Sequence, residues 1–217
     1  MSDMKAYFDR VFQGQITRPG SAELLKWLKK SDFFTAPASS RFHLSRPGGL
    51  VEHSVNVYER LKQLCECEAL NDPSFVEPSP ETIAVIGLLH DVCKIGVYIQ
   101  STRNQKSYDP AKIAAANPYQ VKHDQLGDFI WESIVGYQFD DPIPYGHGEK
   151  SVYLISEFMK LTREEAFAIR FHMGAWTDSD YDKRNAGKAF DLYPLALFTH
   201  LADMMATHID DLKEVPS

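Results

Sequence analysis

The sequence predicts an all-α fold in a single domain, with a small β-hairpin inserted into a helical bundle. Apolar residues recur at helical spacing in several segments, and residues 83–95 (IAVIGLLHDVCKI) are apolar almost all round, as in a buried helix. Residues 129–139 (FIWESIVGYQF) have the aromatic and β-branched content of a strand. The 217 residues, 44% of them hydrophobic, suit one globular domain with a full core.

The single domain is expected to have three parts. Residues 1–47 form an N-terminal helical extension, residues 48–211 form the core, and residues 97–140 form the ribbon or loop insertion, in which 101–118 is expected to be irregular. Ser21 is the expected N-cap of the second helix, and Thr162 with Glu165 forms a capping box. The remaining helices are expected at 50–67, 150–161 and from about 191 onward, and 176–188 is expected to be a polar loop.

Composition places the protein in a reducing cytoplasm. Three cysteines do not suit a disulfide framework, the N-terminus lacks the features of a signal peptide, and no apolar run reaches the length of a membrane span. The net charge of −7 argues against a protein that follows a long phosphate backbone. We therefore expect no membrane partner, and the oligomeric state stays open.

The segment 83–95 carries His90, Asp91 and Lys94 near its C-terminal end. Burying this polarity costs several kcal/mol unless something compensates it. A metal ion held by His90 and Asp91 is the simplest compensation, and Lys94 leans over the same point because it follows them by four and three residues. A capping Asp beside a satisfied His is the alternative.

Further candidate ligands lie on other apolar helical segments. His147 begins a helix between two glycines, and Asp203 shares a helix face with His200. Convergence of these helices would join imidazoles and carboxylates at one point, a mixture that Mn, Fe, Zn, Co and Ni accept. The candidate metal ligands are His53, His90, Asp91, His147, His172 and Asp203.

The order H…HD…H…H…D resembles the HD superfamily of metal-dependent phosphohydrolases. The resemblance runs from about Gly48 to Asp211 and is carried by GGLVEHSVNV, GLLHDVCKIG, GHGEKSVYLI, IRFHMG and FTHLADMMAT. The GHGEKS and IRFHMG segments are most similar to the branch that includes 3′–5′ exoribonucleases and bacterial and phage HD hydrolases. Those exoribonucleases carry a separate nucleic-acid-binding barrel, for which 217 residues leave no room.

The resemblance implies one or two divalent metal ions, of Mn, Fe, Mg, Ni, Co or Zn. It assigns His53, His90, Asp91 and Asp203 to the first ion, His147 and His172 to the second, and phosphate contact to Lys94. Some two-metal members have a His-His pair where this chain has Phe171-His172. The second ion would then have one ligand fewer, or use His200 or water.

The function expected from this pattern is hydrolysis of a phosphate ester of a nucleotide or short oligonucleotide by a metal-activated water. The expected catalytic residues are Asp91, which bridges two ions, Lys94, which neutralises phosphoryl charge, and His200, which protonates the leaving oxygen. Lys183, Arg184 and Lys188 are candidates to bind the rest of a phosphorylated substrate, or are a solvated stretch of chain. A di-iron oxygenase and a non-catalytic binding module braced by metal are the alternatives.

Overall fold

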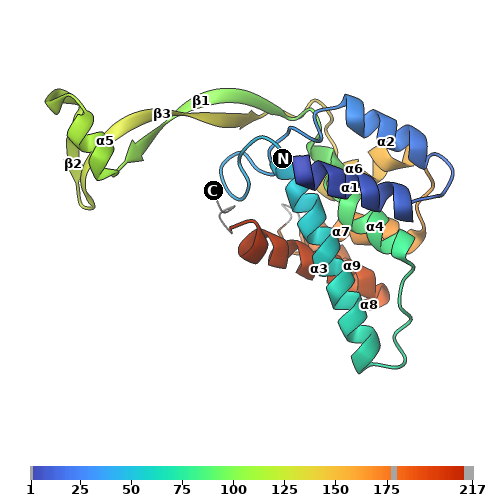
Figure 1. Cartoon of the computed structure of the whole chain (residues 1–217). Helices are drawn as coiled ribbons and strands as arrows, with labels where there is room; N and C mark the ends of the chain where they lie inside the picture. Colours follow the sequence, from blue (N-terminus) through green and yellow to red (C-terminus); the bar gives the residue numbers. More distant parts are fainter. Residues whose placement is uncertain (1, 177–179, 213–217) are drawn as a thin grey trace.

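The computed structural model describes residues 2–176 and 180–212, and in this part a helical body carries a long β-ribbon (Figure 1). The predicted helical fold with a β-insertion is confirmed. The elements are α1 Ser2–Gln15, α2 Ser21–Lys30, α3 Gly49–Asn71, α4 Pro80–Leu89, the 3-10 turn η1 Val92–Lys94, β1 Tyr98–Ser107, α5 Pro110–Ala115, the 3-10 turn η2 Pro118–Gln120, β2 Lys122–Asp124, β3 Gly127–Phe139, α6 His147–Ser156, α7 Arg163–Phe171, α8 Asp180–Leu192, α9 Pro194–Met205 and the π-helical turn η3 Ala206–Asp210.

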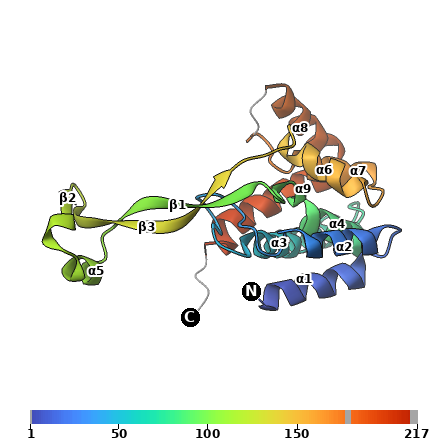
Figure 2. The same ribbon diagram turned by 90° about the horizontal axis from the view of Figure 1, so that it is seen from above.

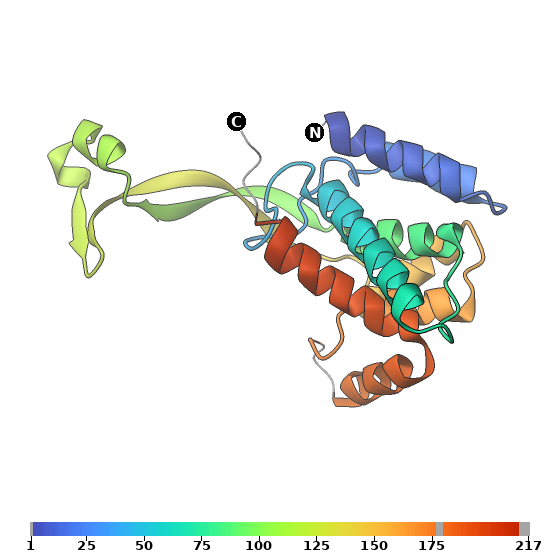
Figure 3. The same cartoon turned by 60° about the horizontal axis from the view of Figure 1, so that its bottom comes forward.

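The centre of the helical body is formed by α3 and α4, with α9 beside α3 (Figure 3). Figure 2 shows α1 on one side of this centre, and α6, α7 and α8 on the other. Burial of apolar side chains from all these layers drives their packing. Fully buried members of the core include Leu28, Leu50, Leu61, Ile86, Leu88, Ile155 and Ile169.

A glycine sets the close approach of α3 and α4. A Cβ built on Gly87 of α4 would lie 2.5 Å from the Cα of Tyr58 on α3, so a side chain at this position does not fit. Because His90 follows Gly87 by less than one turn, this crossing also brings the end of α4 close to the first turns of α3.

The buried segment 83–95 is not one continuous helix. The helix α4 ends at Leu89, His90 is its C-cap, and Asp91 has left the helical region with φ −109° and ψ 18°. The chain then makes the 3-10 turn η1 and leaves through Gly96, whose φ of 70° is accessible to glycine at little cost. The polar residues therefore lie on a turn at the helix end, where their side chains spread in different directions.

The insertion is a ribbon that projects away from the helices (Figures 1 and 2). Strands β1 and β3 pair antiparallel from Tyr98 opposite Phe139 to Ser107 opposite Ile130, and β2 pairs with β3 at the far end. The predicted strand at 129–139 is confirmed, but the expectation of irregular chain from 101 was wrong, because β1 continues to Ser107. Both faces of the ribbon meet solvent, so its polar strand lacks the apolar alternation by which strands are recognised.

Two local expectations were also wrong, and one was confirmed. Most of the expected loop 176–188 is the start of α8, whose buried Ala186 and Ala189 pack at helical spacing; residues 177–179 lie outside the described part. The N-cap of α2 is Gly20, so Ser21 is already helical. The capping box of Thr162 and Glu165 is present. None of the described helices has the length and hydropathy of a membrane span.

The α3–α4 crossing predicts that Gly87→Ala destabilises the protein by about 1–3 kcal/mol, because the added methyl forces the two helices apart. The measurement is urea unfolding followed by circular dichroism. Gly14→Ala in α1 is the matched control, because nothing lies within 4 Å of its Cβ position, and it should be neutral or stabilising. Equal midpoints for wild type and Gly87→Ala would contradict the role given to this crossing.

Candidate metal centre

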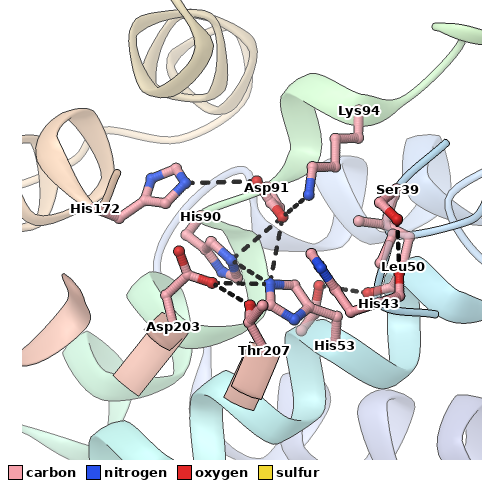
Figure 4. Close-up of polar contacts among 12 residues, drawn as sticks. Ser39, His43, Leu50, His53, His90, Asp91, Lys94, His172, Asp203 and Thr207 are labelled. Carbon is pink, nitrogen blue, oxygen red and sulfur yellow. Dashed lines mark hydrogen bonds and ion pairs between the residues drawn. The ribbon is translucent and has the colours of Figure 1, made fainter. Parts of the chain in front are cut away.

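A single buried carboxylate, that of Asp91, lies at the centre of the candidate site (Figure 4). One of its oxygens, Oδ2, is 3.5 Å from Nε2 of His53 and 3.5 Å from Nε2 of His90. The same His53 nitrogen is 3.2 Å from Oδ1 of Asp203, which comes from α9. Four candidate ligands from α3, the end of α4 and α9 therefore meet on the Oδ2 side.

The other oxygen of Asp91 faces a second group of donors. Oδ1 is 2.8 Å from Nε2 of His147 at the start of α6, and 3.5 Å from Nε2 of His172 at the end of α7. The six sequence-predicted ligands are thus brought together, three on one side of Asp91 and two on the other. This division between the two oxygens is what a carboxylate that bridges two ions requires.

Lys94 also reaches Asp91. Its ammonium nitrogen lies 2.7 Å from Oδ2, and its side chain is 13% exposed. Burial lowers the pKa of Lys94, but the Asp91 charge more than offsets this and raises it above its ordinary value. The side chain therefore stays positive. The more exposed side chain of His147 opens the cluster further, with 34% of it accessible. His147 is therefore the most exposed of the six candidate ligands.

Hydrogen bonds at Nδ1 fix the tautomers of the buried imidazoles. His90 donates from Nδ1 to the carbonyl of Gly87 at 2.9 Å, and His172 donates from Nδ1 to the carbonyl of Ile169 at 2.7 Å. Both histidines cap a helix, and both bond to the carbonyl three residues earlier. Since a carbonyl only accepts, the Nε2 atom of each neutral ring carries a lone pair toward the cluster.

His53 is held in the same way by a carboxylate. Its Nδ1 is 2.8 Å from Oδ2 of Asp211, and the other oxygen of Asp211 accepts a bond from Nδ2 of Asn56 at 2.8 Å. Asp211 is buried and follows η3, which Arg60 of α3 holds through a paired contact to Asp210. Such carboxylate–histidine contacts are typical of metal-ligating histidines, because they fix the ring and raise its basicity.

The carboxylates of Asp91 and Asp203 stay ionised in the ion-free cluster. Burial raises the pKa of Asp91, but the Lys94 charge and a hydrogen bond from His147 hold it well below its usual range, so Asp91 is a carboxylate. Burial lowers the pKa of His53, but bonds to Asp203 and Asp211 more than offset this and raise it to about 9. Lone pairs on Nε2 that face carboxylate oxygens repel them unless a proton or a metal lies between. The donor set therefore fits divalent metal ions.

Three other histidines lie at different distances from the cluster. The ring centroid of His43 is 5.0 Å from that of His53, and its buried Nε2 has no hydrogen-bond partner among the described atoms. His200 donates from Nδ1 to the carbonyl of His172 at 2.7 Å and stacks on Phe190. His123 is exposed on β2 of the ribbon and contacts Asp128.

Two residues of the site carried no usable signal in the sequence. Asp211 lies on a short polar segment after the last helix, without a helical spacing that links it to His53. Cys93 is far in the sequence from the other two cysteines, so no spacing marks it as a metal ligand, yet its sulfur contacts His147. Burial and the Asp91 charge raise the pKa of Cys93 to about 12, so its thiol keeps its proton while no ion is bound.

The contact between Asp211 and His53 predicts that Asp211→Asn weakens metal binding by roughly ten- to a hundredfold. The amide has only one oxygen, so it cannot accept hydrogen bonds from His53 and Asn56 on two separate oxygens. Titration calorimetry with Mn²⁺ measures this. Asp210→Asn is the control, since it disturbs the adjacent contact with Arg60 without touching a candidate ligand. Equal affinities for wild type and Asp211→Asn would contradict the positioning role.

Comparison with known proteins identifies the family. The model of the family described as HD domain matches residues 50–207, which include all six candidate ligands and exclude Asp211 and His43. No curated protein and no solved structure matched the chain significantly. A match over most of the chain, together with histidines and aspartates gathered as described above, shows that this chain belongs to the HD-domain family.

Proposed function

We propose that this protein is a binuclear metal-dependent phosphohydrolase that cleaves a phosphate ester of a nucleotide or short oligonucleotide. Membership of the HD-domain family implies a metal-dependent hydrolase in general terms. The observation that carries the more specific proposal is the Asp91 carboxylate, whose two oxygens face different groups of imidazoles. Bound divalent ions would supply a water of lowered pKa and positive charge for the phosphoryl oxygens.

The chain's own residues have separate parts in this proposal. Asp91, His53, His90 and Asp203 would hold one ion, and Asp91, His147 and His172 would hold a second. Lys94 is positive and partly exposed beside Asp91, which suits it to receive a phosphoryl oxygen and offset its charge. Burial of the cluster strengthens these interactions, because they act in a medium of low dielectric.

A hollow on the α7–α8 side of the helical body has a lining suited to a nucleotide, and none of the six candidate ligands is part of that lining. It has a volume of about 650 Å³, within the range of small-molecule sites, and lies between α7, α8 and the start of α6. Arg163, Arg170 and Lys188 line it together with Phe167 and Tyr181, so it offers cations for phosphate and rings for a base. Of the cations expected to bind the substrate, Lys188 is in the hollow, whereas Lys183 pairs with Asp180.

The central test of the proposed function is Asp91→Ala. Wild-type protein purified without chelator should contain about two ions per chain and hydrolyse bis-p-nitrophenyl phosphate with Mn²⁺. The variant should lose both ions and at least about a hundredfold in turnover while its helical circular dichroism persists. Asp128→Ala on the exposed ribbon should change neither quantity.

Retained turnover in Asp91→Ala would overturn the proposed mechanism. Two bound irons with oxygen uptake and no ester hydrolysis would instead support the oxygenase alternative. Bound metal without any reaction would support the binding module.

We also propose that His200 protonates the leaving oxygen. Its contacts indicate a competing role, which is to position His172. Its Nδ1 donates to the carbonyl of His172, so it also braces a candidate ligand. A proton donor matters most for a poor leaving group. His200→Ala should therefore slow hydrolysis of an alkyl phosphate much more than that of a p-nitrophenyl ester. Equal losses for both substrates, together with lower metal content, would assign His200 to positioning alone.

A further inference from the structure

The second donor group, on the Oδ1 side of Asp91, contains a thiol. Cys93 lies on η1, two residues after Asp91, and is buried. Its Sγ is 3.9 Å from Oδ1 of Asp91 and 3.5 Å from Nε2 of His147. Sulfur, nitrogen and oxygen donors thus surround one point, and all three lie within 4.8 Å of one another.

The distances among these atoms are close to those of donors around a single ion, and the sulfur–oxygen distance of 3.9 Å is the longest of them. Metal–donor bonds of about 2.0–2.3 Å at tetrahedral angles separate neighbouring donors by roughly 3.3–3.6 Å. The sulfur–nitrogen distance of 3.5 Å already has this value. The nitrogen–oxygen distance of 2.8 Å is that of the hydrogen bond in the ion-free cluster, and it would open by about half an ångström around an ion.

The backbone at Cys93 is anchored against α6. The backbone N–H of Cys93 donates to Oγ of Ser151, which lies one helical turn after His147 on α6. This bond holds η1 against the helix that carries His147. The sulfur is 3.4 Å from Nδ1 and 3.5 Å from Nε2 of that ring, so it lies over the ring face, and the thiol or the ring turns when both bind one ion.

Neither Phe171 nor His200 adds a donor atom on this side of Asp91. Phe171 stands before His172, and its side chain lines the hollow between α7 and α8. His200 is committed to the carbonyl of His172 and packs on Gly174, whose built Cβ would lie 2.6 Å from the His200 ring. Cys93 is the remaining described donor that reaches both Asp91 Oδ1 and His147.

We propose that Cys93 is a thiolate ligand of the second metal ion, together with Asp91 Oδ1 and His147 Nε2, and with His172 within reach of the same oxygen. This inference rests on the proposed binuclear site. Binding forms a metal–sulfur bond, and the thiol proton leaves to solvent. Because thiolate is a soft donor, this position would select Zn²⁺, Co²⁺ or Fe²⁺ over Mg²⁺ and Mn²⁺, while the all-N/O position beside His53 accepts the harder ions as well.

The test is a Co²⁺ titration of protein stripped of metal, followed by absorption spectroscopy. Wild type should develop a sulfur-to-cobalt charge-transfer band in the near ultraviolet, which a site of nitrogen and oxygen donors cannot produce. Cys93→Ser should bind Co²⁺ without this band. Cys67→Ser is the matched control, because Cys67 is an exposed cysteine on α3, and it should keep the band in full.

Each outcome bears on one of the two proposals. Two bound Co²⁺ ions without a charge-transfer band in wild type would overturn the role of Cys93 and leave the binuclear site intact. No bound Co²⁺ at all would overturn the proposed function itself. If Cys93→Ser does not fold, X-ray absorption of the Zn²⁺-loaded wild type decides: a sulfur scatterer at about 2.3 Å supports the inference, and a shell of only nitrogen and oxygen contradicts it.

Discussion

The structure depends on one buried carboxylate, that of Asp91, whose negative charge needs positively charged partners. Asp91 is almost completely inaccessible, and imidazoles with inward-facing Nε2 atoms surround it. Moving a charged carboxylate from water into such surroundings costs several kcal/mol, and only a nearby opposite charge offsets this cost. Lys94 supplies one positive charge. A pair of metal ions, one for each oxygen of Asp91, would supply the rest and remove the repulsion between lone pairs.

The helices meet this requirement with a repeated local arrangement. The helices α4 and α7 each end in a histidine that bonds to the carbonyl three residues before it, so that both rings point from a helix end into the same centre. Gly87 lets α3 come close enough to place His53 beside His90, and their Nε2 atoms are 3.3 Å apart. Because helix ends and a glycine crossing position the ligands, the centre is part of the core rather than an addition to the surface.

The order and chemistry of the candidate ligands were predictable from the sequence, because each lies on an apolar segment where a charged or polar side chain needs a reason. The sequence did not predict that Asp91 lies outside α4, because the apolar pattern continues unbroken past the helix end at Leu89. Helix α8 was missed for the opposite reason: its buried face consists of alanines in a polar segment. Asp211 and Cys93 act through contacts between segments distant in the chain or at a turn, and neither periodicity nor spacing reports such contacts.

Anomalous X-ray diffraction from crystals grown with Co²⁺ would test the central claim most directly, because it locates each ion independently of activity. The account predicts two anomalous peaks roughly 3.5–4 Å apart, one on each side of the Asp91 carboxylate. The first peak should lie near His53, His90 and Asp203, and the second near His147 and His172. A single peak bound to one oxygen of Asp91, or none at this carboxylate, would contradict the account.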